Sequence, residues 1–132
     1  MDTIEVISDP APLCPDSRLQ VVKIDVSGVD SKSALLNAMG AAMKLPDYYG
    51  SNWDALEECL RDLEQDERGW LVIFENADRL LSLPKQELTT LLAILADTSA
   101  FWKNEGRLFR SVFVGSSALA AAVGEAGENR PA

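Results

Sequence analysis

The 132-residue chain is long enough for one domain, and its 47% hydrophobic content is sufficient to bury a continuous core. Its formal net charge of -9, from 21 acidic and 12 basic residues, would repel nucleic acid and attract a cationic partner, although acidity also simply keeps a protein soluble. Histidine is absent, which removes the usual general base, the usual partner of a Ser or Cys nucleophile and the commonest metal ligand.

The cysteine content and the N-terminal sequence predict a cytoplasmic location. Cys14 and Cys59 have neither the spacing of a metal site nor that of a disulfide framework, so both thiols suit a reducing compartment. Residues 1–5 lack the basic and apolar regions of a signal peptide, and no apolar run approaches the roughly 20 residues that span a bilayer. We expect no membrane association.

The first 19 residues predict an extended leader. A short β-like run, Ile4–Ile7, is followed by Pro10, Pro12 and Pro15, which lack backbone donors and restrict the backbone angles. The leader is therefore expected to lie outside the main domain.

The first core strand is predicted over residues 19–26, where β-branched side chains dominate. Asp30 or Ser31 is expected to cap the helix that follows, because apolar residues recur there at helical spacing until Pro46 ends the pattern.

A second helix is predicted from Ser51 and Asn52 onward, with Asp54 completing a capping box from Ser51. One side of this helix is apolar, and it consists of Trp53, Leu56, Cys59, Leu60 and Leu63. The other sides carry charge, and their residues are Asp54, Glu57, Glu58, Arg61 and Asp62. The pattern is typical of an amphipathic helix with an acidic outer surface.

The second half of the chain predicts a parallel sheet. Trp70–Phe74 shows no polar alternation, as expected of a strand buried on both faces. A helical turn or loop over 76–83 is followed by Pro84 at the start of a helix to about Phe101, and a third strand is expected over 108–114. This order of elements predicts an α/β fold with right-handed crossovers.

The domain organisation follows from these elements. Residues 20–116 are expected to form one domain, between the leader and a short C-terminal helix with a flexible tail over 117–132. The sequence contains no internal repeat.

The cluster Asp54, Glu57 and Glu58 allows three interpretations. A catalytic pair would need a setting that separates two pKa values, which a solvated helix face does not offer. A metal site would lack imidazole and thiolate ligands, and no nucleotide-binding motif is present, so we expect no metal, no cofactor and no enzymatic activity. Acids in a first helical turn also stabilise the helix dipole by about 0.3–1 kcal/mol each.

The aromatic residues Tyr48, Tyr49 and Trp53 immediately precede and overlap this acidic cluster. Tyrosine and tryptophan beside charges are typical anchors of protein interfaces, whereas burial in the core would give them a structural role. Both interpretations remain open at this point.

The run LPDYYGSNWDALEECL over residues 45–60 resembles the signature of the barstar family, in which L-P-x-Y-Y-G-x-N-x-D-A-L-x-D-C-L leads into the inhibitory helix. The agreement in order and spacing extends from about Val21 to Gly115. The resemblance implies a small three-stranded parallel sheet packed with helices. It also implies an acidic helix and adjoining loop that block the active site of a ribonuclease.

The resemblance also assigns roles to individual side chains. Tyr48 would be the family's contacting tyrosine, Asp54 its first contacting aspartate, and Glu58 the aspartate that takes the place of an RNA phosphate. The remaining residues expected to contact the partner are Tyr49, Asn52, Trp53, Glu57, Arg61 and, on the third helix, Asp97.

Three positions depart from the family pattern. Glu57 stands where an aromatic residue is common, Glu58 is one methylene longer than aspartate, and Arg61 adds a positive charge to an acidic face. Such changes retune specificity or mark a change of partner. We therefore expect a monomeric inhibitor of a basic, secreted ribonuclease that binds no nucleic acid. The alternative is a regulatory or scaffolding module on the same fold with a non-nuclease partner.

Overall fold

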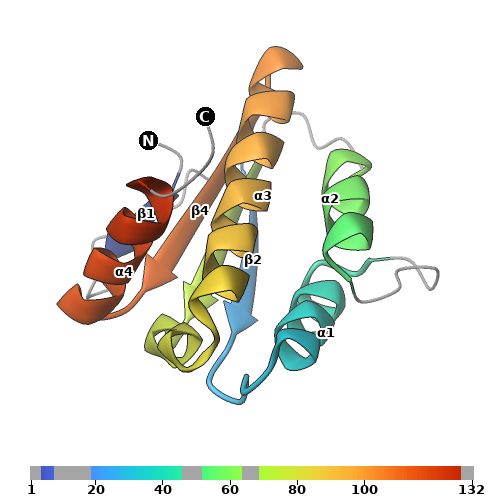
Figure 1. Cartoon of the computed structure of the whole chain (residues 1–132). Coiled ribbons are helices and arrows are strands. Elements are labelled where there is room, and N and C mark those ends of the chain that lie inside the picture. The colour runs from blue at the N-terminus through green and yellow to red at the C-terminus, as the bar shows by residue number, and fades with distance from the viewer. Residues whose placement is uncertain (1–3, 8–18, 46–51, 64–68, 129–132) are drawn as a thin grey trace.

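The computed structural model describes residues 4–7, 19–45, 52–63 and 69–128, with the side chains of the last range described as far as residue 124. Within these ranges one parallel sheet is covered by helices on one of its faces (Figure 1). The predicted α/β class with a parallel sheet is confirmed. No helix of these ranges combines the length and apolar character needed to cross a membrane.

The described sheet has four strands in the order β1-β4-β3-β2, and all neighbouring pairs are parallel. The strands are β1 (Ile4–Ile7), β2 (Gln20–Asp25), β3 (Gly69–Glu75) and β4 (Leu108–Val114). Every residue of β3 from Gly69 to Phe74 is buried, as its unbroken apolar run predicted.

The described residues contribute four strands to the sheet, whereas three were expected. The additional strand is β1, which pairs with β4 in a register that runs from Ile4 opposite Ser111 to Ile7 opposite Val114. The β-like run of Ile4–Ile7 is visible in the sequence, but its partner lies more than a hundred residues away. Local patterns do not reveal such a pairing.

The helical elements also follow the predicted order. They are α1 (Lys32–Ala42), α2 (Trp53–Arg61), the 3-10 helix η1 (Ala77–Ser82), α3 (Lys85–Asn104) and α4 (Ser117–Glu128). Ser31 caps α1, since its hydroxyl accepts a hydrogen bond from the Ala34 amide at 3.1 Å.

The capping box predicted from Ser51 to Asp54 is wrong. Asn52 is the N-cap of α2, and its side-chain oxygen accepts a hydrogen bond from the Ala55 amide at 2.8 Å. With Asn52 as the cap, the third helical position is Ala55, whose methyl group cannot return a hydrogen bond.

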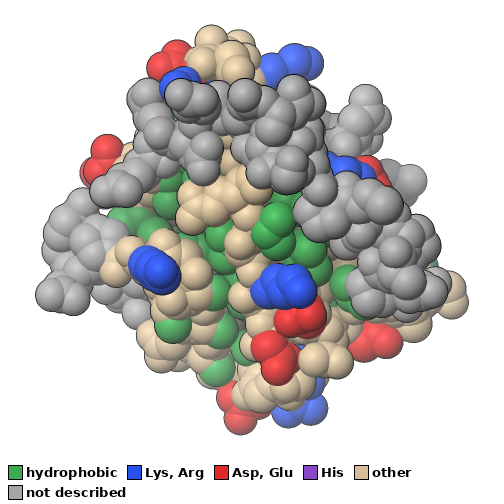
Figure 2. All heavy atoms as spheres, turned by 180° about the vertical axis from the view of Figure 1, so that it is seen from behind, with side chains coloured by type: hydrophobic (Ala, Val, Ile, Leu, Met, Phe, Trp, Pro, Cys, Tyr) green, Lys and Arg blue, Asp and Glu red, His purple; other side chains and the backbone are tan. Residues whose placement is uncertain are grey.

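The main core lies between the sheet and the helices. It includes Phe74 and Phe113, stacked with 4.5 Å between ring centroids, and the tilted pair Trp70 and Trp102 at 4.7 Å. The opposite face of the sheet carries a smaller cluster of Leu71, Ile73 and Val112. Seen from that side, hydrophobic side chains lie near the centre with charges of both signs around them (Figure 2).

Candidate functional site

Helix α2 separates its apolar and charged residues onto different sides, as its sequence predicts. Leu56, Cys59 and Leu60 are buried, and the two leucines are completely inaccessible to solvent. Asp54 and Glu58 are exposed one helical turn apart and project away from this buried side. The sheet and α3 therefore hold an acidic stripe at the surface.

The carboxylates of Asp54 and Glu58 remain available to a partner. Within the described residues, no hydrogen bond or ion pair joins either side chain to another residue. Asp62, just after the helix, is exposed as well. The side-chain oxygens of Asp54, Glu58 and Asp62 are hydrogen-bond acceptors, so they can receive hydrogen bonds from cationic side chains.

Glu57 differs from these acids because its charge is compensated within the chain. Its Oε1 lies 2.9 Å from Nη2 of Arg61, one turn further along α2. The Arg61 guanidinium carbon in turn lies 5.8 Å from the centre of the Phe101 ring on α3. The positive charge that the sequence places on this acidic face is therefore held between a carboxylate and an aromatic ring.

Hydrogen bonds to α3 fix α2 near both of its ends. At the start of α2, the indole N–H of Trp53 donates to Oε2 of Glu87 at 3.0 Å. At the other end, the indole N–H of Trp102 donates to the carbonyl oxygen of Leu60 at 2.9 Å. The two helices lie next to each other, with α2 on the side of α3 away from α4 (Figure 1). The acidic stripe thus sits on a rigid support.

Trp53 is oriented mainly toward its own chain. Its side chain is partly buried, packs against the main core and uses its only donor on Glu87. Asn52 is exposed, but its side-chain oxygen caps α2. Both residues position the helix, and their contact with a partner stays a prediction.

Of the remaining residues predicted to contact a partner, the structure describes one. Asp97 is exposed on α3, the helix beside α2. Tyr48 and Tyr49 lie outside the described residues. Glu87 and Phe101 were missed by the sequence analysis, because their roles depend on packing between two helices rather than on spacing within one.

Cys59 has no reactive character. It is a free, buried thiol, and burial, reinforced by the charges of Glu58 and Asp62, raises its pKa above the ordinary value. Among the described residues, no group of His, Cys, Asp and Glu side chains is arranged to hold a metal ion.

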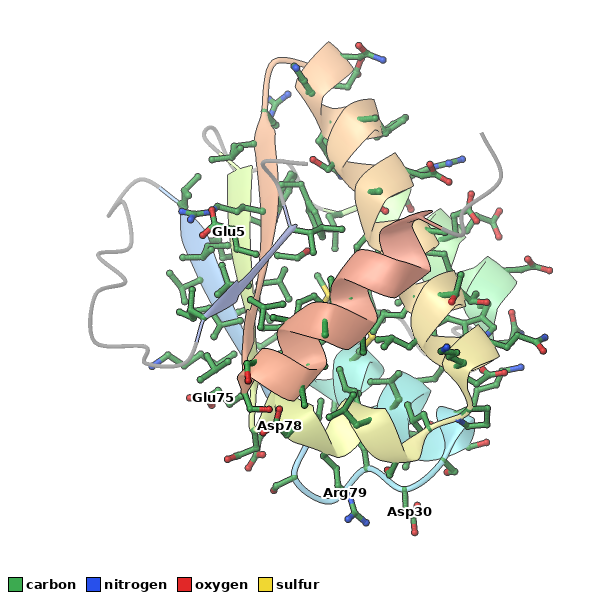
Figure 3. The ribbon with its side chains drawn as sticks, turned by 60° about the vertical axis from the view of Figure 1, so that its left-hand side comes forward. Glu5, Asp30, Glu75, Asp78 and Arg79 are labelled. Carbon is green, nitrogen blue, oxygen red and sulfur yellow. The ribbon has the colours of Figure 1, made fainter. Side chains whose placement is uncertain are left out.

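A second group of acids lies at the carboxyl end of the sheet, where Figure 3 labels Glu75 and Asp78. Here Oδ1 of Asp78 accepts hydrogen bonds from the amide and the hydroxyl of Ser116, at 2.8 and 2.9 Å. Oδ1 of Asp25 accepts from the Ser27 amide at 2.9 Å and from the side-chain amide of Asn76 at 3.0 Å. Asp78 and Asp25 therefore stabilise their own chain.

Comparison with known families agrees with this arrangement. Residues 19–114 match the family model described as Barstar (barnase inhibitor). The chain belongs to the barstar family. The family is one of inhibitors rather than enzymes, which confirms the expectation that this chain has no enzymatic activity. No curated protein matches the chain significantly.

The barstar match covers the whole candidate surface but not the whole fold. It includes α2, α3 and the strands β2, β3 and β4, whereas β1 and α4 lie outside the matched residues. Strand β1 extends the sheet beyond β4, and α4 packs against α3 and β1. These additions lie on the side of α3 away from α2 (Figure 1), so they leave the acidic stripe uncovered.

Proposed function

We propose that this barstar-family chain inhibits a basic, barnase-like ribonuclease by placing the carboxylates of α2 in the enzyme's phosphate-binding site. The observation that carries the proposal is the pair Asp54 and Glu58, exposed one turn apart on a helix that hydrogen bonds fix to α3 near both ends. The description of the family as barnase inhibitors supports the same partner.

The mechanism is electrostatic mimicry of the substrate. A ribonuclease holds RNA phosphates with lysine and arginine, and carboxylates form similarly strong charge-assisted hydrogen bonds with those groups. A side-chain carboxylate offers no phosphodiester bond to cleave, so the occupied enzyme is blocked. Because α2 is already rigid, little conformational entropy is lost on binding. The net charge of -9 accelerates encounter with a cationic enzyme.

Individual roles follow from position on the surface. Glu58 takes the place of a phosphate, Asp54 binds a neighbouring cation, and Asp97 contributes a charge from α3. Tyr48 and Tyr49, from the segment that leads into α2, provide aromatic contacts. We place the inhibition of the ribonuclease in the cytoplasm, where a reducing environment keeps the Cys59 thiol free.

The pairing of Glu57 with Arg61 gives the alternative partner its specific support. An inhibitor directed only at cations would gain from an unpaired Glu57, yet this carboxylate is compensated within the chain. A regulatory or scaffolding module that binds a less basic protein through the same face would explain that pair.

Calorimetric titration against a barnase-like ribonuclease separates the two functions. The proposal predicts 1:1 binding that Glu58→Ala weakens by about 100-fold, because one buried charge of the complex loses its partner. Asp30→Ala, which removes an exposed acid outside α2, is the matched control and should bind like the unmodified chain. Absence of binding by the unmodified chain would favour the alternative partner.

A further inference from the structure

Phe101 is exposed in a way that the rest of the aromatic core is not. Its side chain is 36% exposed, whereas the adjacent Trp102 is 2% exposed. The two rings meet edge to face, with centroids 5.1 Å apart and planes at 85°. Because Trp102 is itself buried and hydrogen-bonded to Leu60, it gives the exposed ring a firm support.

Arg61 covers part of this ring and is held there. Its guanidinium carbon lies 5.8 Å from the ring centre, and Glu57 fixes the same group through the 2.9 Å ion pair. The side chains of Arg61 and Glu57 are 42% and 35% exposed, so all three groups can meet a partner. We call Glu57, Arg61 and Phe101 together the aromatic edge.

The aromatic edge and the acidic stripe differ in charge. Glu57 and Arg61 cancel, so the aromatic edge is neutral, while Asp54 and Glu58 leave the stripe anionic. A partner's lysine or arginine placed over the edge would meet a like charge on Arg61, and the ring beneath already has a cation beside it. An apolar side chain would instead bury the ring without leaving a charge unpaired.

We infer that the aromatic edge determines specificity by selecting a ribonuclease with an apolar side chain beside its phosphate-binding site. The inference rests on the proposed function, since it concerns the same enzyme and the same face. The acidic stripe binds the cations of the active site, and the edge rejects enzymes that place a further cation next to them. Phe101 and Arg61 are thus specificity residues.

Dissociation rates test the inference, with a barnase-like ribonuclease as the probe at about 0.05 and about 0.5 M salt. Phe101→Ala should accelerate dissociation about tenfold at both salt concentrations, because an apolar contact is not screened. Glu58→Ala should instead have an effect that shrinks as salt rises. Leu81→Ala, which truncates an exposed side chain on η1, is the matched control. It should leave the dissociation rate unchanged at both salt concentrations. Phe101→Leu keeps an apolar group and should have a smaller effect.

Arg61→Gln provides a second readout that a purely structural role would not give. Removing a cation from an acidic face should accelerate association with a basic enzyme, whether or not Arg61 touches that enzyme in the complex. If Arg61 also touches the enzyme, dissociation accelerates too. Unchanged dissociation in Phe101→Ala and Arg61→Gln, with a clear effect of Glu58→Ala, would overturn the aromatic edge and leave the proposed function intact. Failure of the unmodified chain to bind would overturn both.

Discussion

The acids of α2 and the acids at the carboxyl end of the sheet have the same charge but opposite uses. Asp78 and Asp25 accept hydrogen bonds from backbone amides and neighbouring side chains of their own fold. Asp54 and Glu58 are exposed, and no described residue pairs with their carboxylates. Net charge alone therefore does not locate a binding surface. The hydrogen bonding of each carboxylate distinguishes one that stabilises the fold from one that can serve a partner.

The largest effect is expected from Asp54 and Glu58, whose carboxylates pair with no residue that the structure describes. Changing both Asp54 and Glu58 to alanine should weaken binding to a barnase-like ribonuclease by about 10⁴-fold, because two charge pairs of the complex are lost. The stability of the free chain should change by less than about 1 kcal/mol, because Asp54 contributes only its interaction with the dipole of α2. Calorimetric titration and urea unfolding measure the two quantities. A loss of binding that came with unfolding would contradict the division between the two groups of acids.

Asp78→Ala should have the reverse effect. It removes two hydrogen bonds to Ser116 at the start of α4, which should lower the free energy of unfolding by about 1–2 kcal/mol. Binding to the ribonuclease should be unchanged, since η1 and α4 lie away from α2. Ser116→Ala retains the amide donor and should cost less in urea unfolding. Unchanged stability of Asp78→Ala would show that its hydrogen bonds contribute nothing.

Trp53→Phe tests the support of α2 rather than its charge. The ring is largely kept while the N–H that bonds Glu87 is removed, so the free energy of unfolding should fall by about 1 kcal/mol. Without this hydrogen bond the first turn of α2 is held less firmly, which should weaken binding to the ribonuclease only a few-fold. Glu87→Gln keeps an acceptor for the indole and serves as the matched control in thermal unfolding. A change as large as that of Glu58→Ala would mean that Trp53 itself contacts the partner.

The smallest effect concerns Asp25 and appears only in acid. The Ser27 amide, the Asn76 side chain and the Ser27 hydroxyl lower the pKa of Asp25 below its ordinary value of 3.8. A lowered pKa in the folded state means that Asp25 stabilises the fold above pH 3.8 and loses this contribution as the pH falls through the folded-state value. Asp25→Asn should flatten this part of the stability profile in urea unfolding and leave neutral-pH binding unchanged. If the free energy of unfolding depended on acidic pH in the same way in both proteins, Asp25 would make no pH-dependent contribution to stability.

The sequence predicted those parts of the fold that depend on local periodicity. The apolar run Trp70–Phe74 predicted the buried strand β3, and helical spacing predicted the buried side of α2. Both patterns arise because a single strand or helix buries its apolar side chains in the core, so each pattern is complete within a few residues. Helical spacing also placed Asp54 and Glu58 on the charged sides of this helix.

The parts that were missed depend on contacts between distant segments. Strand β1 joins the sheet through β4, and the hydrogen bond of Trp53 goes to Glu87 on another helix. The contact between the Arg61 guanidinium and the Phe101 ring has the same origin. Spacing along one helix indicates which of its side chains share a face, but not which residues of a neighbouring helix will contact them.

Inhibition of RNA cleavage tests the central claim most directly. A barnase-like ribonuclease should be titrated with the unmodified chain and with Glu58→Ala while cleavage of RNA is followed. The account predicts that one equivalent of the unmodified chain abolishes cleavage and that Glu58→Ala has an inhibition constant about 100 times larger, measured at an enzyme concentration below that constant. Cleavage that persists in excess unmodified chain, or equal inhibition constants for both proteins, would contradict the claim that the exposed carboxylates of Asp54 and Glu58 block the enzyme.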